Sequence, residues 1–244
     1  MGVTTTFDRD LFELFSEYSG MPLEEVQKAA RNYGGINELH WQECDGDTWE
    51  ERARQFYSLA DGYVFDLIHA NQSKAHLQAV YEKWGHWPWI SQSGPDVLEF
   101  GGGLGLACSL FRDLGRKVTY VDIDSSPSRF ARWYYERTQQ TDIEVVITPQ
   151  EDLVLPEDRQ WDFVFSDAVL EHIIDPAPTV ERLARAVRPG GMMYLIIDAH
   201  NVGPGFPMHK HVYLDDLLKG SPTLRSMQHI LHDGDGLNAF VMPA

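Results

Sequence analysis

The sequence predicts an α/β protein in which a doubly wound, mostly parallel sheet of seven strands follows an N-terminal helical region. From residue 95 onward, short apolar segments alternate with helical segments, which is typical of a parallel sheet covered by helices on both faces. A turn signal at 233–236 separates the last two apolar segments and predicts a C-terminal antiparallel hairpin. We therefore divide the chain into a helical region, residues 1–92, and a sheet domain, residues 93–244.

Local signals place helices in the N-terminal region. Pro22 occupies a position favoured in the first helical turn, and the glycine pair at 34–35 predicts the end of that helix. Residues 48–51 have the pattern of a capping box, and apolar residues continue at helical spacing as far as Leu67. Aromatic residues interrupted by glycine and proline at 84–89 predict a packed connector.

The sheet domain contains seven predicted strands and four predicted helices. The strands are expected over residues 97–100, 118–122, 143–147, 163–166, 192–198, 226–232 and 237–242. The helices are expected over residues 104–114, 126–138, 179–187 and 213–218. Sheets of this kind bind ligands at the carboxyl ends of their strands, near the point where the strand order reverses. We therefore expect a site there.

Composition and charge exclude several classes of partner. The formal net charge is −17, and this field repels phosphodiester backbones, so nucleic acid is not an expected partner. No run of about 18 apolar residues and no charged-then-apolar leader occurs, so no membrane partner is expected. Cys44 and Cys108 have neither CxxC nor metal-binding spacing, which favours a reduced, cytoplasmic protein.

An apolar segment runs into four glycines at 97–105, where the backbone must turn tightly or lie against something else. A phosphate-binding P-loop needs Lys-Ser or Lys-Thr after the glycines, and neither follows. The dinucleotide pattern GxGxxG fails because Leu106 occupies its last position, which disfavours a nicotinamide oxidoreductase. The pattern acidic-x-Gly-x-Gly-x-Gly does fit, at Glu99, Gly101, Gly103 and Gly105.

Acidic residues follow at the ends of the next two strands. Asp122 ends the second strand, where a carboxylate can accept hydrogen bonds from both hydroxyls of a ribose. Alternatively Asp122 or Asp124 caps the helix that follows, and Asp124 is the better candidate for that cap. After the third strand, Glu151 and Asp152 stand beside Leu153, an arrangement that can accept from an adenine amino group while the leucine packs under the ring.

Two further segments complete a recognisable series, namely 161–172, which contains Leu-Glu-His, and 185–191, which contains Arg-Pro-Gly-Gly. With the glycine motif, the acidic end of strand two and the Glu-Asp-Leu turn, they resemble class I S-adenosylmethionine-dependent methyltransferases over about residues 95–200. The resemblance implies a Rossmann-like fold, S-adenosylmethionine as co-substrate, and methyl transfer to a small-molecule acceptor that leaves S-adenosylhomocysteine. The helical region matches no motif and is expected to form part of the acceptor pocket.

The resemblance also implies roles for individual residues. Gly101 and Gly103 would let the backbone approach the methionine portion of the co-substrate, and Glu99 would orient the glycine loop. The remaining contacts would be Asp122 on the ribose, Glu151 and Asp152 beside the adenine, and Ser166 and Asp167 toward the amino-acid end. Glu99 could instead be a strand carboxylate paired elsewhere. Cys108 is expected to belong to the core.

A general base is needed only where the acceptor holds a proton that must leave. His172 follows the fourth strand and is our candidate base, with a hydrogen-bonded structural histidine as the alternative. His209 and His211 lie in a loop rich in glycine and proline and are the reserve candidates. Their spacing would suit a metal pair, but no third ligand is evident, so we expect no metal.

Two rival functions stay open at this point. A chain of this fold could be a non-catalytic cofactor-binding or partner subunit, or it could act on a peptide or carrier-bound acceptor. The methylated atom (oxygen, nitrogen or carbon), the identity of the acceptor and the oligomeric state do not follow from the sequence.

Overall fold

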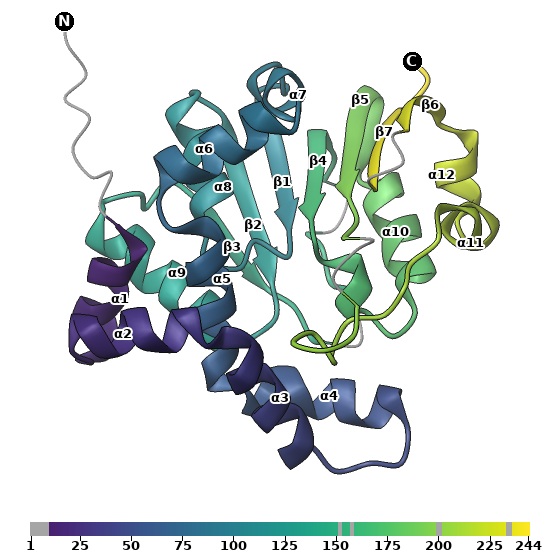
Figure 1. Ribbon diagram of the computed structural model, residues 1–244. Coiled ribbons are helices and arrows are strands. Elements are labelled where there is room, and N and C mark those ends of the chain that lie inside the picture. The colour runs from purple at the N-terminus through teal and green to yellow at the C-terminus, as the bar shows by residue number, and fades with distance from the viewer. Residues whose placement is uncertain (1–9, 151–152, 157–158, 199–201, 233–235) are drawn as a thin grey trace, which may run out of the picture.

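The computed structural model describes residues 10–150, 153–156, 159–198, 202–232 and 236–244, and it shows a seven-stranded sheet between two layers of helices (Figure 1). The strands are β1 (Asp96–Phe100), β2 (Lys117–Asp122), β3 (Glu144–Ile147), β4 (Trp161–Asp167), β5 (Val187–Ile196), β6 (Gln228–His232) and β7 (Leu237–Val241). Their order is β3-β2-β1-β4-β5-β7-β6, and only the pairings of β7 are antiparallel. The predicted fold class is confirmed, and β7 is the hairpin strand that pairs with β5.

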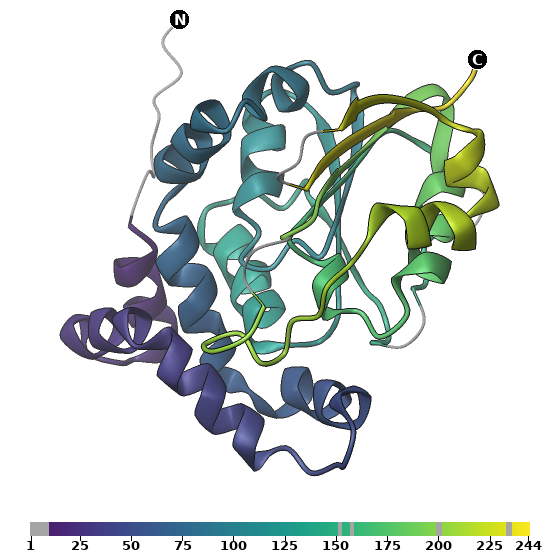
Figure 2. The ribbon, with the colours of Figure 1, turned by 45° about the vertical axis from the view of Figure 1, so that its right-hand side comes forward.

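Helices cover both faces of the sheet and extend beyond one end of it. In chain order the helices are α1 (Leu11–Ser19), α2 (Leu23–Arg31), α3 (Tyr33–Glu43), α4 (Trp49–Leu59), η1 (Asp61–Tyr63), α5 (Val64–Asn71), α6 (Lys74–Lys83), α7 (Trp87–Ser91), α8 (Leu106–Asp113), α9 (Ser126–Arg137), η2 (Leu170–His172), α10 (Pro176–Arg185), α11 (Leu214–Gly220) and α12 (Pro222–Ser226). α10 to α12 lie on one face, and α6, α8 and α9 lie on the other (Figure 1). α3 and α4 project past the carboxyl ends of the strands (Figures 1 and 2).

The central strands are apolar on both sides because helices cover both faces. Val97 and Phe163 belong to the buried cluster under α8 and α9, whereas their neighbours Leu98 and Val164 belong to the cluster under α10. Successive side chains of a strand point to opposite faces, so a strand covered twice needs an unbroken apolar run. This requirement explains why short apolar runs identified the sheet in the sequence.

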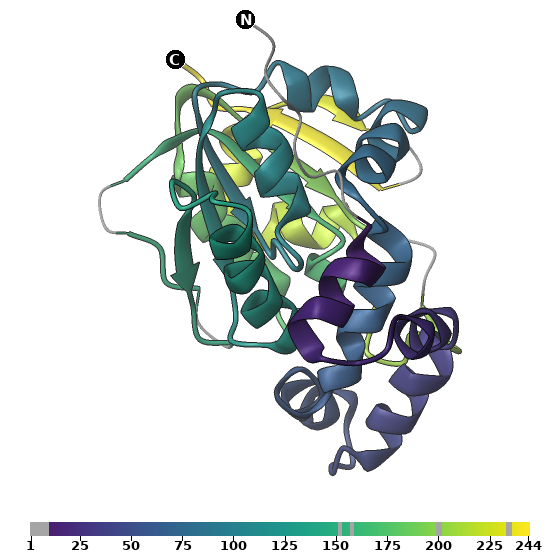
Figure 3. The same ribbon diagram turned by 90° about the vertical axis from the view of Figure 1, so that its left-hand side faces the viewer.

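The N-terminal helices share a hydrophobic core with the sheet domain. Leu11, Phe15 and Ile68 belong to the same buried cluster as Phe130 of α9, and the rings of Phe15 and Phe130 are 5.7 Å apart. α1 lies beside α5 and α9 (Figure 3). The boundary at residue 92 stays a prediction, and the buried apolar core continues across it.

The predicted C-terminal end of the helix that begins near Pro22 is wrong. α2 ends at Arg31, and Gly34 and Gly35 lie inside the next helix, α3. A Cβ atom at Gly34 would lie 3.5 Å from the Cα of Gly205, which is an ordinary van der Waals contact. The glycine pair is therefore tolerated inside a helix and does not mark a helix end here.

The capping box at residues 48–51 is confirmed. The Glu51 N–H donates to Thr48 Oγ1 at 3.3 Å, and the Thr48 N–H donates to Glu51 Oε2 at 3.2 Å. The helix that it begins does not continue to Leu67, however. α4 ends at Leu59, whose side chain is 59% exposed, and the short helix η1 intervenes before α5. The predicted connector at 84–89 becomes helical at α7.

Helices α3 and α4 are held by contacts with the segment 202–209. The indole N–H of Trp49 donates to the carbonyl of Pro207 at 3.1 Å, and the Gly205 N–H donates to Glu38 Oε1 at 2.8 Å. These contacts join parts of the chain more than 150 residues apart. They close one side of the space beyond the carboxyl ends of the strands.

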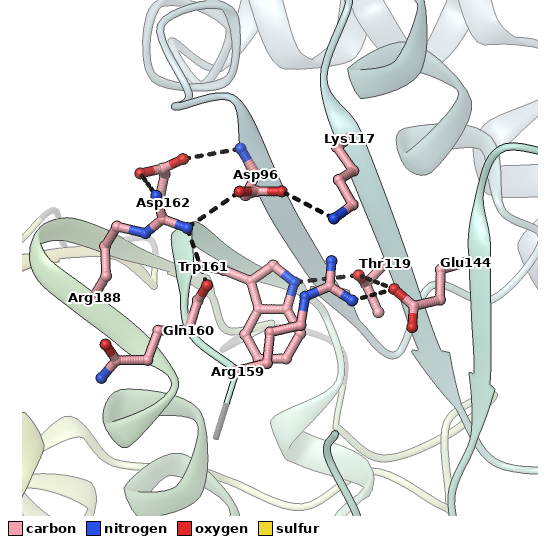
Figure 4. A network of polar contacts seen from close by, with 9 residues as sticks. All are labelled: Asp96, Lys117, Thr119, Glu144, Arg159, Gln160, Trp161, Asp162 and Arg188. Atoms are coloured by element: carbon pink, nitrogen blue, oxygen red, sulfur yellow. Dashed lines mark hydrogen bonds and ion pairs between the residues drawn. The ribbon is translucent and has the colours of Figure 1, made fainter. Parts of the chain in front are cut away.

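The amino ends of β1, β4 and β5 are joined by a network of paired charges (Figure 4). The Arg188 guanidinium lies 2.9 Å from Asp162 Oδ1 and 3.1 Å from Asp96 Oδ2, and it donates to the carbonyl of Gln160 at 3.1 Å. Asp162 Oδ2 also accepts from the Asp96 N–H at 2.9 Å. Arg188 is the arginine of the Arg-Pro-Gly-Gly segment, and here it ties three strands together.

Candidate active site

A cavity of about 770 Å³ lies at the carboxyl ends of the strands. Its walls come from the glycine loop after β1, the end of β2, the segments that follow β3, β4 and β5, and the helices α3, α4 and α5. Glu99, Gly101, Gly103, Asp122, Asp167, His172 and His209 are the predicted site residues that line it. The structure therefore brings together most of the predicted site residues that it describes.

The glycine loop needs glycine both for its backbone and for its packing. Gly101 has φ 74° and Gly105 has φ 78°, in the left-handed region that residues with a Cβ atom rarely adopt. A Cβ atom at Gly101 would collide with Val169, and one at Gly105 would collide with Tyr135. Side chains of the protein therefore pack against these glycines, while Gly101 and Gly103 face the cavity.

Asp122 holds the glycine loop in place. Its Oδ2 accepts from the Gly103 N–H at 2.8 Å and lies 3.1 Å from the Tyr120 hydroxyl, and its Oδ1 accepts from the Ile123 N–H at 2.7 Å. Burial raises the pKa of Asp122, and the bonds from Gly103, Ile123 and Tyr120 oppose that rise. A carboxylate has about four acceptor positions, so capacity is left for ligand hydroxyls.

Neither Asp122 nor Asp124 caps the following helix, and the predicted cap at Asp124 is wrong. Ser125 is the N-cap of α9, because its hydroxyl accepts from the Ser128 N–H while Ser128 Oγ accepts from the Ser125 N–H. The Asp124 side chain is 71% exposed and lies 3.4 Å from Arg129. The two serine hydroxyls accept from the backbone N–H groups of Ser125 and Ser128, so Asp124 is not part of the cap.

Glu99, which is buried, and Asp167, which is half-buried, are acids near the ends of β1 and β4. Burial raises the pKa of Glu99 to about 8, opposed by hydrogen bonds from Cys108, which is itself buried as predicted. Burial also raises the pKa of Asp167 to about 6, although this carboxylate accepts from the Tyr81 hydroxyl at 2.9 Å. Both side chains line the cavity without a cationic partner among the described residues.

Some predicted site residues lie elsewhere. Ser166 is 1% exposed and points away from the cavity, because it follows Phe165 and precedes Asp167 on a strand with alternating faces. His211 is exposed, and its ring stacks on Tyr213 at 6.1 Å. Glu151 and Asp152 lie outside the described residues. The neighbouring Leu153 does line the cavity.

His172 is half-buried at the cavity wall, between two tyrosines. Its Nδ1 is in a short contact with the Tyr57 hydroxyl, and its Nε2 lies 3.4 Å from the Tyr63 hydroxyl. Burial lowers the pKa of His172 well below its usual value, and the nearby His209 lowers it further. The rings of His172 and His209 are 4.3 Å apart at 90°. The imidazole is therefore neutral and fixed at both nitrogens.

The residues that the sequence did not single out come from the N-terminal helices. Tyr33, Tyr57, Tyr63 and Asp66 all line the cavity. Asp66 Oδ2 accepts from the amide of the buried Asn37 at 3.1 Å, and burial raises the Asp66 pKa to about 6. The available signal was weak, namely hydroxyl-bearing aromatics in a helical region expected to cover the site. The partner of Tyr57 and Tyr63, His172, is more than 100 residues away in the sequence.

Comparison with known proteins places the chain in a family. The sequence pattern of the family described as a methyltransferase domain matches residues 75–238, which is more than half of the chain. The chain belongs to this methyltransferase-domain family. The resemblance to class I S-adenosylmethionine-dependent methyltransferases, drawn from the sequence motifs, is confirmed.

Two curated relatives carry the description ubiquinone biosynthesis O-methyltransferase. The one from Acinetobacter baylyi is 30% identical over 111 residues, which make up 43% of this chain and 47% of that protein. The one from Xanthomonas oryzae pv. oryzae (strain PXO99A) is 33% identical over 164 residues, which make up 61% of this chain and 68% of that protein. The chain thus spans about half the length of the first relative.

A solved structure extends the likeness of fold. The phosphoethanolamine N-methyltransferase 2 of Haemonchus contortus, solved with phosphomonomethylethanolamine and S-adenosylhomocysteine, superposes with a TM-score of 0.58 at 13% identity. The match covers 82% of this chain and 61% of that chain. None of the helices in the described residues is both long and apolar enough to cross a bilayer.

Proposed function

We propose that this protein transfers a methyl group from S-adenosylmethionine to an oxygen atom of a small-molecule acceptor. One observation carries the proposal. A single cavity is lined at one end by the glycine loop and Asp122, and at the other by Tyr57, Tyr63 and His172. A cavity that holds two reactants side by side aligns them before they react, which lowers the entropic part of the reaction barrier.

The residues at the glycine end fit the co-substrate. Gly101 and Gly103 leave backbone exposed to the cavity, and Asp122 has acceptor capacity for the two ribose hydroxyls. Glu99 and Asp167 are acids with raised pKa values that a cationic ligand would stabilise in their charged form. When bound, S-adenosylmethionine supplies a methyl group activated on a positively charged sulfur.

The residues at the other end would bind and orient the acceptor. The hydroxyls of Tyr57 and Tyr63, both fixed on His172, offer polar groups in an otherwise aromatic wall that includes Phe206. We propose that His172 acts on the acceptor through Tyr57, because the tyrosine hydroxyl occupies its Nδ1. The relatives described as O-methyltransferases support oxygen as the methylated atom.

The expected partners follow from charge. A net charge of −17 supports a small-molecule acceptor over nucleic acid. The cytoplasmic location and the absence of a membrane partner stay predictions.

Titration calorimetry with S-adenosylmethionine and S-adenosylhomocysteine tests the first half of the proposal, with an expected affinity in the micromolar range, about −8 kcal/mol. Transfer of labelled methyl to a panel of phenols, alcohols and amines, followed by mass spectrometry, tests the second half. Absence of binding by both nucleosides contradicts the proposal. Binding without transfer to any acceptor class favours the alternative of a non-catalytic subunit, and transfer confined to amines contradicts oxygen as the acceptor atom.

A further inference from the structure

Three side chains from separate segments meet beside the acceptor end of the cavity. Glu171 lies in η2, Asp198 follows the end of β5, and His209 belongs to the segment held by Trp49. Each offers one ligand atom, and these atoms all lie within 4.8 Å of one another. The His209-x-His211 spacing had suggested a metal pair without a third ligand. The fold leaves His211 outside and supplies two carboxylates instead.

Glu171 provides an independent sign of a missing ligand. Its side chain is fully buried, and its Oε2 has no hydrogen-bond partner among the described residues. Its Oε1 accepts from the Asp198 N–H at 3.3 Å. A buried acceptor oxygen without a hydrogen bond destabilises the fold. Such an oxygen therefore indicates that a ligand interacts with it.

The nearest lysine does not neutralise this carboxyl group. The Lys210 N–H donates to the backbone carbonyl of Glu171 at 3.0 Å, but its ammonium group is directed elsewhere. The ammonium contacts the carbonyl of Ile174 and lies 5.6 Å from the ring centre of Trp49. No lysine or arginine in the described part of the chain forms an ion pair with Glu171.

We propose that Glu171, Asp198 and His209 bind one divalent cation, and that this cation binds an oxygen atom of the acceptor. Two carboxylate oxygens and one imidazole nitrogen suit Mn²⁺ or Mg²⁺, which favour oxygen-rich sites and keep open positions for water or substrate. Asp198 and His209 line the cavity, so the open positions face it. The second half of the inference rests on the proposed function, whereas the first half does not.

The position next to His172 gives the cation a role. The His209 ring lies 4.3 Å from that of His172, which contacts Tyr57 and Tyr63. An acceptor oxygen on the cation would therefore lie beside the two tyrosine hydroxyls. A metal ion also lowers the pKa of a hydroxyl group bound to it, which favours the form that accepts a methyl group.

The test is a titration of the chelator-treated full-length protein with Mn²⁺, followed by electron paramagnetic resonance of the free ion. We expect one bound ion per chain and a loss of affinity of about 10- to 100-fold or more in both Glu171→Gln and His209→Gln. Glutamine at 171 keeps an oxygen for the Asp198 N–H. Asp216→Asn, which removes an exposed carboxylate from α11, is the matched control and should bind as the wild type does.

Absence of Mn²⁺ binding by the wild type, or equal binding by wild type and Glu171→Gln, overturns the site. Calorimetry with S-adenosylhomocysteine on the metal-free protein separates this result from the proposed function. Binding of Mn²⁺ at these residues without binding of a nucleoside supports the metal site and contradicts the proposed function. Binding of the nucleoside without binding of Mn²⁺ is consistent with the proposed function and contradicts the metal site.

Discussion

Acidic residues have opposite environments at the two ends of the strands, which we call the amino edge and the carboxyl edge of the sheet. At the amino edge, Asp96 and Asp162 both pair with Arg188, and the three residues join β1, β4 and β5 (Figure 4). At the carboxyl edge, no lysine or arginine among the described residues forms an ion pair with the buried Glu99 and Glu171 or the half-buried Asp122 and Asp167.

The consequence appears in the pKa values. Burial raises the pKa of Glu99 and of Glu171 to about 8 and that of Asp167 to about 6. Paired charges stabilise a fold, whereas buried acids without cations reduce its stability and are kept where a ligand interacts with them. The amino edge therefore stabilises the fold, whereas we propose that the carboxyl edge binds positively charged or hydrogen-bond-donating ligands.

The largest expected effect is at the carboxyl edge. His172→Ala should lower turnover by about 10²–10⁴-fold while cofactor affinity changes little, because the histidine fixes Tyr57 and Tyr63 beside the acceptor. His211→Ala is the matched control, since that ring is exposed and outside the cavity. Steady-state kinetics with an identified acceptor, together with calorimetry, measures both. Near-normal turnover in His172→Ala would remove this residue from the reaction.

Asp122→Asn should weaken binding of S-adenosylhomocysteine by about 1.5–3 kcal/mol, or about 10- to 150-fold, because the asparagine loses the charge that strengthens bonds from ribose hydroxyls. The exposed Asp124 offers a control two residues away, and Asp124→Asn should leave affinity and unfolding unchanged within about 0.5 kcal/mol. Calorimetry and urea unfolding check the pair. An affinity loss in Asp124→Asn alone would reverse the assignment.

Cofactor affinity should fall as the pH decreases through 6. The Asp167 pKa of about 6 belongs to the protein without ligand, and a cationic ligand favours the ionised form. Below pH 6 the bound proton must leave before the carboxylate can pair, so affinity should decrease by about tenfold between pH 7 and pH 5. Calorimetry of wild type and Asp167→Asn across this range measures the effect. The same slope in both proteins would show that another group is responsible.

A substitution at the amino edge should change the free energy of unfolding and not cofactor affinity or turnover. Arg188→Met leaves Asp162 without its cation and leaves Asp96 with only Lys117 at 3.9 Å, so unfolding in urea should require about 1–2 kcal/mol less. Cofactor affinity should not change, because the cavity is at the other edge. Arg185→Met is the control, since this arginine is mostly exposed. A loss of affinity in Arg188→Met would contradict the separation of the two edges.

The part of the cavity that we propose binds the cofactor was predictable from the sequence because its residues are close in the chain. Gly103 and Asp122 are joined by a hydrogen bond across only 19 positions, and the glycine pattern precedes a recognisable strand. The acceptor end combines distant residues. Tyr57 and His172 are 115 positions apart, and no local pattern links them. Their juxtaposition depends on how the N-terminal helices pack.

The errors of the sequence analysis have a common physical origin. Local rules assigned the cap of α9 to Asp124 and a helix end to Gly34, but competing neighbours decided both. A serine pair caps α9, and Gly34 lies inside α3. The choice between Ser166 and Asp167 also needed the face of β4, which depends on the register of the strand with its neighbours.

The contact between Trp49 and Pro207 also has a consequence for the order in which the molecule is made. The two residues are 158 positions apart, so at about 5–20 residues per second the ribosome adds Pro207 about 8–30 s after Trp49. During this interval α3 and α4 exist without the segment that holds them. The acceptor side of the cavity is therefore completed late in synthesis, after the glycine loop and β2 have been made.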